Sequence, residues 1–171
     1  MEKRSGIKGQ IQLSFGMIFS VILIGITLFV AGYVTMNFVK TADCSKLGSF
    51  YKGIEGEVET VYQNNGETKK TLNALPSVPS KVSFVCFGSL TQNAADANDE
   101  VMQNYFIQRG LDKENNIFFY PMQSSCEKKY ASFNVAHLTN SEFFCVRATD
   151  GKVPVKITKD ESTNLLVKLN K

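Results

Sequence analysis

The stretch GQIQLSFGMIFSVILIGITLFVAGYVTMNFV, residues Gly9–Val39, contains no charged side chain. As an α-helix these 31 residues would be about 46 Å long, which exceeds the ~30 Å hydrocarbon thickness of a bilayer. The stretch is too long for the apolar region of a secretory signal, and no small-residue cleavage pattern follows it. We therefore predict a transmembrane helix over residues 10–39, surrounded by the lipid bilayer.

The distribution of charge predicts how the chain is oriented. The net charge of +3 lies entirely in residues 1–40, and residues 41–171 hold equal numbers of basic and acidic side chains. Basic residues before a span favour a cytoplasmic N-terminus. We expect a cytoplasmic basic flank over residues 1–9 and an extracytoplasmic domain over residues 40–171, at the cell membrane. The balanced charge of that domain argues against a nucleic-acid partner.

Small residues recur along one side of the predicted span. Ser14, Gly25 and Gly32 are separated by eleven and seven residues, which places them near one helix face. Small side chains let a second helix approach closely, so this face is a candidate for self-association. The alternative is that Gly and Ser are simply common in membrane spans.

The sequence KGQIQLSF, Lys8–Phe15, resembles the class III signal peptide of archaeal type IV pilin-like proteins. In that family a peptidase cuts between Gly and Gln on the cytoplasmic side, and the retained helix packs into a filament core. The resemblance implies cleavage between Gly9 and Gln10. The family usually has Glu four residues after the Gln, where this chain has the uncharged Ser14.

Residues 41–171 resemble small single-span archaeal surface proteins, through a VCF strand (Val85–Phe87) and an FFC strand (Phe143–Cys145). That resemblance implies a compartment and an architecture but no activity. A protein outside the cell is, separately, a candidate partner.

The pattern after the span predicts an α+β fold. The transmembrane helix would run into an amphipathic helix that packs on a mostly antiparallel sheet of about five or six strands. The amphipathic helix is indicated by apolar residues at steps of three and four, and it would end at Asn64-Asn65-Gly66. This predicted stripe consists of Leu47, Tyr51, Ile54, Val58, Val61 and Tyr62.

Short aromatic and β-branched segments predict the strands. They are KVSFVCF (81–87), NIFFYP (116–121), ASFNVAHL (131–138), EFFCVRA (142–148), KVPVKIT (152–158) and NLLVKLN (164–170). Asp150-Gly151 would join the fourth and fifth of these as a hairpin. The pairs Phe118/Phe119 and Phe143/Phe144 place one ring on each face of a strand. We expect both faces to be covered, so that these rings form core; an open face would make them an adhesive patch.

A short helix should begin near Asn98 and stop at Gly110. Its predicted apolar stripe consists of Val101, Met102, Tyr105 and Phe106.

Four cysteines, Cys44, Cys86, Cys126 and Cys145, all follow the span. An even number in an oxidising compartment predicts two disulfides, with three connectivities left open. Cys86 and Cys145 fall in predicted strands and are candidate neighbours across the sheet. No CxxC pair pre-organises a metal site, and we expect no metal or cofactor.

One group of residues has the types needed for thiol catalysis. His137, Cys145 and Arg147 match the residue types of a sortase, in which a base activates a thiol and a cation steadies the oxyanion. The eight-residue gap between His137 and Cys145 gives no reason for them to meet, and a disulfide explains Cys145 better.

Three functional hypotheses follow. The first is a non-catalytic, single-pass surface protein with a binding or structural role. The second is a pilin-like filament subunit processed between Gly9 and Gln10. The third is an anchored thiol enzyme that uses Cys145 and His137.

Overall fold

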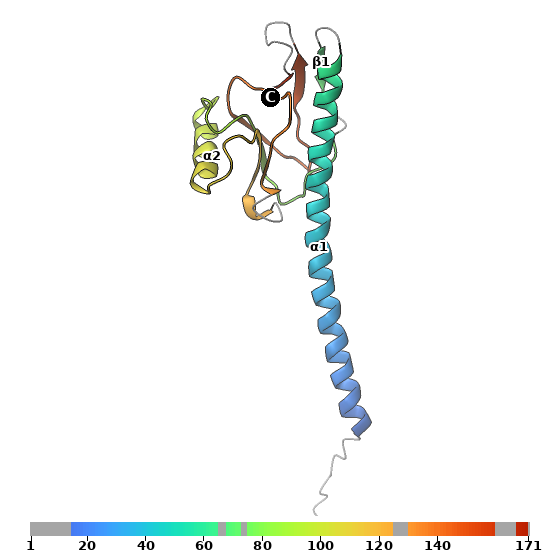
Figure 1. Ribbon diagram of the computed structural model, residues 1–171. Helices are drawn as coiled ribbons and strands as arrows, with labels where there is room; N and C mark the ends of the chain where they lie inside the picture. The colour runs from blue at the N-terminus through green and yellow to red at the C-terminus, as the bar shows by residue number, and fades with distance from the viewer. Residues whose placement is uncertain (1–14, 65–67, 73–74, 125–129, 160–166, 171) are drawn as a thin grey trace, which may run out of the picture. The chain divides into compact units, whose positions relative to one another are not determined.

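A computed structural model describes residues 15–64, 68–72, 75–124, 130–159 and 167–170 (Figure 1). The chain divides into two compact units, Met1–Val39 and Lys40–Lys171. The elements are α1 (Phe15–Gln63), β1 (Thr68–Thr71), β2 (Phe84–Phe87), α2 (Ala97–Gln108), β3 (Ile117–Tyr120), the 3₁₀ helix η1 (Met122–Ser124), β4 (Ser132–Phe133), β5 (Phe144–Arg147), β6 (Lys156–Lys159) and β7 (Val167–Asn170).

The part of α1 in the first unit is apolar and exposed. Among the described residues, α1 is the one helix long and apolar enough to cross a membrane. Its large apolar side chains from Phe15, which is 84% exposed, to Val39 are all exposed. Length and composition therefore make this segment a candidate membrane anchor.

The part of α1 in the second unit supplies one side of a hydrophobic core. Its buried residues recur at steps of three and four, as the sequence predicts, with Phe50 in place of Tyr51 as the most buried aromatic residue. Tyr51 lies at the margin of this core and stacks on Phe133, with ring centroids 4.7 Å apart. The buried residues of this stripe are Leu47, Phe50, Ile54, Val58 and Val61.

The strands form two sheets rather than the single sheet that the sequence predicts. One sheet has the order β1-β6-β7, and the other has the order β4-β3-β2-β5. All pairings between these strands are antiparallel. The α+β class and the antiparallel pairing are therefore confirmed, and the number of sheets was predicted wrongly.

The predicted hairpin at Asp150-Gly151 is only a turn. Both residues have positive φ, and Thr149 and Lys152 exchange backbone hydrogen bonds of 3.0 and 2.9 Å. Beyond the turn the chain leaves β5, because Gly151 O accepts from Val78 N and Val155 O accepts from Leu72 N. β6 consequently joins the other sheet. Gly151 is required here, since a Cβ would lie 2.7 Å from Val78 O.

The four-stranded sheet is covered on both faces. Phe119 and Phe144 belong to the core that contains the buried residues of α1. Phe118 and Phe143 belong to a second cluster with Phe106 of α2. The alternation of adjacent phenylalanines between two cores is confirmed, since all four rings are buried.

Helix α2 begins earlier than the sequence predicts. Its N-cap is Asp96 rather than Asn98, because the Asp96 carboxylate accepts hydrogen bonds from the backbone N–H groups of Asn98 and Asp99. The helix buries Asp99, Gln103 and Phe106, while Val101 is 68% exposed. The predicted apolar stripe was therefore wrong at Val101.

Candidate functional site

Cys86 and Cys145 form a disulfide between two neighbouring strands. They lie directly opposite one another in the β2–β5 register, with Cα atoms 3.9 Å apart. Their expected proximity across the sheet is confirmed. Cys44 is also disulfide-bonded, and Cys126 lies outside the described residues.

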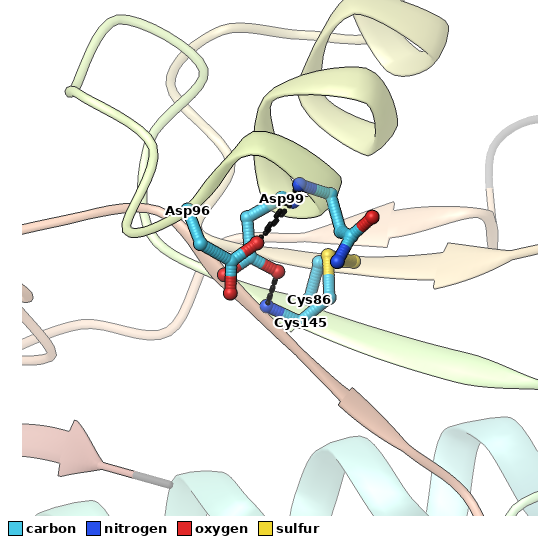
Figure 2. The surroundings of a disulfide bond; sticks show 5 residues. Cys86, Asp96, Asp99 and Cys145 are labelled. Atoms are coloured by element: carbon cyan, nitrogen blue, oxygen red, sulfur yellow. Dashed lines mark hydrogen bonds between the residues drawn. A yellow bond between two sulfur atoms is a disulfide. The ribbon is translucent and has the colours of Figure 1, made fainter.

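The disulfide lies beside the first turn of α2 (Figure 2). Asp99 is only 3% exposed, and its Oδ1 accepts a 2.9 Å hydrogen bond from the backbone N–H of Cys145. Asp96 Oδ1 accepts from the N–H groups of Asn98 and Asp99, each at 2.9 Å. The acidic start of α2 is thereby attached to the outer edge of β5.

A cavity of about 430 Å³ lies at this junction. Its apolar lining comes from Phe84, Val101, Met102 and Cys145, and its polar lining comes from Asp96, Asn98 and Asp99. A lining of apolar surface with a few polar groups is typical of ligand sites, and the volume lies within their usual range of about 300–1,000 Å³.

His137 and Cys145 are not brought together as a catalytic pair. Cys145 is bonded to Cys86, so it is not a thiolate nucleophile in this structure. The sequence predicts His137 in a strand, and this is wrong. The residue lies in a turn with φ 63°, because β4 ends at Phe133. Its ring stacks on Tyr62, with centroids 3.7 Å apart.

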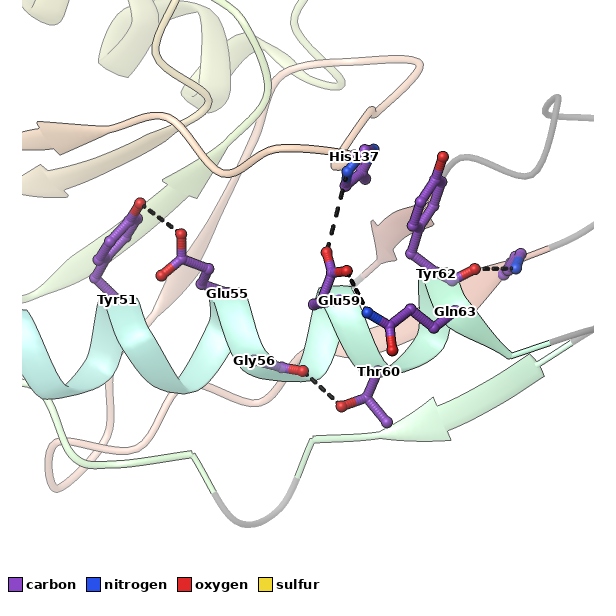
Figure 3. A network of polar contacts seen from close by, with 9 residues as sticks. Tyr51, Glu55, Gly56, Glu59, Thr60, Tyr62, Gln63 and His137 are labelled. Carbon is purple, nitrogen blue, oxygen red and sulfur yellow. Dashed lines mark hydrogen bonds and ion pairs between the residues drawn. The ribbon is translucent and has the colours of Figure 1, made fainter.

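His137 belongs to a polar network along the last turns of α1 (Figure 3). Its Nε2 lies 4.0 Å from Glu59 Oε2, and Glu59 Oε1 accepts from Gln63 Nε2 at 2.6 Å. One turn earlier, Tyr51 donates to Glu55 Oε1 at 3.2 Å. Burial raises the pKa of Tyr51, and the Glu55 carboxylate adds to this rise. These contacts fix the exposed side of α1.

Lys159 holds the C-terminal end of α1. It is only 4% exposed, and its Nζ donates to the backbone oxygens of Tyr62 and Asn64, both at 2.6 Å. The ammonium group also lies 5.6 Å from the centroid of the Tyr62 ring. A cation at this end of a helix satisfies carbonyl groups that have no partner within the helix and opposes the helix dipole.

The remaining sequence candidates fall in the first unit. Gly25 and Gly32 lie in the exposed part of α1, with no other group within 4 Å of an added Cβ. Gly9, Gln10 and Ser14 lie outside the described residues. In the described ranges, no group of three or more His, Cys, Asp or Glu side chains could hold a metal ion.

The comparisons with known proteins give no match. The chain matches no protein-family model, no curated protein and no solved structure.

Sequence reasoning did not assign two polar contacts of this domain. In the sequence, Asp96, Asp99 and Glu100 indicate only an acidic helix start. The contact of Asp99 with Cys145, 46 residues away, leaves no local pattern. The contact between Lys159 and Tyr62, 97 residues apart, has no local signal either.

Proposed function

We propose that this chain is a single-pass membrane protein whose domain over residues 40–171 lies outside the cytoplasm and has a non-catalytic binding or surface-structural role. One observation carries the proposal: the helix from Phe15 to Val39 is uncharged and presents its apolar side chains outward. Lipid is the surroundings in which such a surface is stable.

Two further features support this compartment and orientation. The Cys86–Cys145 bond is of a kind that persists in oxidising spaces outside the cytoplasm. Lys3, Arg4 and Lys8 precede the apolar stretch, which favours a cytoplasmic N-terminus.

Alkaline carbonate extraction tests the anchor. Full-length protein should stay with the membrane pellet, because lipid rather than protein surrounds the apolar segment. Release into the supernatant would overturn the proposal. Protease added to intact cells tests the orientation, since it should digest the 40–171 domain and spare a cytoplasmic control protein.

A pilin-like filament subunit is the second candidate. It is favoured by the resemblance of Lys8–Phe15 to a class III signal peptide and by the length of α1, which runs unbroken through Gln63. Intact mass of the protein from native membranes discriminates the two. A species that begins at Gln10 supports the filament subunit, and a species that retains residues 1–9 supports the simple anchor.

A thiol enzyme needs a free Cys145. Alkylation under denaturing, non-reducing conditions should leave Cys145 unmodified, because it is bonded to Cys86. Full alkylation of Cys145 in protein from native membranes would restore the enzymatic hypothesis.

A further inference from the structure

Part of the outer edge of β5 exposes backbone groups that do not pair with β2. Ala148 N donates to Ser83 O, which continues the β2–β5 register as a hydrogen-bonded pair. Hydrogen-bonded and non-hydrogen-bonded pairs alternate along antiparallel strands. The pairs of Cys145 and of Arg147 are therefore non-hydrogen-bonded, and their backbone N–H and C=O groups face away from β2.

The start of this edge is already occupied. Phe143 N donates to Asn93 O, and Ala95 N donates to Phe143 O, so residues 93–95 lie beside β5 as a short parallel partner. Asp99 then accepts from Cys145 N. Within the described ranges, no hydrogen bond is made by Cys145 C=O, Arg147 N–H or Arg147 C=O.

The outer edge of β7, by contrast, is covered by hydrogen bonds to neighbouring segments of the chain. Val167 N donates to His137 O, and Thr139 N donates to Val167 O. Leu169 N donates to the side chain of Asn140. Proteins commonly cover edges in this way to prevent unwanted pairing. At β5, the C=O of Cys145 and the N–H and C=O of Arg147 have no such cover among the residues that the structure describes.

The cavity of about 430 Å³ lies beside this open segment. An extended peptide that pairs with a strand edge gains affinity from backbone bonds and specificity from pockets for alternate side chains. Phe84 and Met102 offer an apolar wall for an aliphatic chain, and Asp96 and Asp99 place carboxylates in the same lining. A lysine side chain has both of these properties.

We propose that β5 and the first turn of α2 form a groove for an extended segment of a partner protein, which adds as a strand to Cys145 and Arg147 and places a basic side chain in the cavity. This deepens the binding role proposed above by naming the class of partner. Peptide binding is measured on the purified full chain, so a failure of the groove is distinguishable from a failure of the anchor, which carbonate extraction tests.

The probes are two blocked heptapeptides, Thr-Val-Thr-Lys-Thr-Val-Thr and its counterpart with Glu at the centre, each with a fluorophore. Binding to the full chain in detergent is followed by fluorescence polarisation. The lysine peptide should bind at least about tenfold more tightly, the factor that corresponds to one charge-assisted contact. The backbone amides of the lysine peptide form two alternating sets, odd-numbered and even-numbered. N-methylation of one set should abolish binding and N-methylation of the other should not, because only one set faces β5.

Three protein variants test the location of the site. Asn98→Lys introduces a cation into the cavity lining and should weaken binding of the lysine peptide about tenfold and strengthen binding of the glutamate peptide. Asn104→Lys makes the same change at an exposed α2 position outside that lining and should alter neither affinity. Arg147→Pro removes an N–H that the β2–β5 ladder does not use and should weaken binding of both peptides.

Three results would overturn the proposal. They are the absence of saturable binding by either peptide, an affinity unaffected by N-methylation, and equal effects of the two lysine variants. Self-association of the chain that Arg147→Pro abolishes, without peptide binding, would assign the edge to a second copy instead.

Discussion

At the scale of single residues, Lys159 is the clearest case of a buried charge with a structural task. Its ammonium group satisfies two carbonyl oxygens at the end of α1, from a strand more than ninety residues further along the chain. The aliphatic part of the side chain is enclosed by protein, so methionine can occupy much of the same space.

Lys159→Met should lower the free energy of unfolding by about 2–3 kcal/mol, because two carbonyl groups lose charge-assisted hydrogen bonds in a buried place. Lys156→Met, on the same strand but exposed, should change it by less than about 0.5 kcal/mol. Urea unfolding of the full chain in detergent, followed by near-ultraviolet circular dichroism, measures both. Equal effects would show that the contact with α1 contributes nothing.

Asp99 attaches α2 to β5 through its Oδ1, which accepts a hydrogen bond from the Cys145 N–H. Asp99→Ala should cost about 1–3 kcal/mol, because the Cys145 N–H loses its acceptor at a largely buried site. Asp99→Asn keeps an acceptor and should recover most of that loss. The same unfolding assay compares them, and an asparagine variant as unstable as the alanine variant would mean that the charge, not the hydrogen bond, is needed.

At the scale of elements, the sequence predicted best where burial follows a local period. The stripe of α1 from Leu47 to Val61 was readable because residues three and four apart share a helix face. Phe118 and Phe119 were assigned to opposite faces correctly because strand side chains alternate. In both cases the pattern lies within one element.

The sequence failed where the outcome depends on distant segments. Asp150-Gly151 forms the predicted turn, but whether β6 continues along β5 depends on backbone bonds to Leu72 and Val78. His137 lies outside the strand predicted for it, because residues 137–139 form backbone hydrogen bonds with Val167 instead. A turn signal fixes local backbone geometry and not the partner of the following strand.

The exposed helical segment makes a prediction of its own. If the face that carries Gly25 and Gly32 packs against a second helix, Gly25→Leu should reduce crosslinking of the chain in membranes several-fold, because the larger side chain separates the backbones. Ile24→Leu, on a different side of the helix, is the matched control and should have no effect. Unchanged crosslinking in Gly25→Leu would contradict helix packing at that face.

At the scale of the whole molecule, covalent cross-links compensate for strands of only two to four residues. Cys86 and Cys145 are 59 residues apart in sequence. Closing a loop of this length restricts the unfolded chain and is worth about 4 kcal/mol in the chain-entropy account. The double variant Cys86→Ala/Cys145→Ala should therefore unfold at a clearly lower urea concentration than the oxidised parent.

Its control is the parent protein after reduction, which should lose at least as much stability as the double variant. A double variant as stable as the parent would contradict a stabilising role for this disulfide.

The Cys86–Cys145 bond also affects which bands a gel shows after protease digestion of this protein on whole cells. The two sulfur atoms enclose α2, β3 and β4 within one covalent ring. A single backbone cut anywhere inside that ring leaves both fragments tethered, and they migrate as one band until a thiol reagent separates them. Trypsin-shaving experiments on whole cells therefore need paired gels, with and without reductant, before an intact band is taken as a sign of an inaccessible domain.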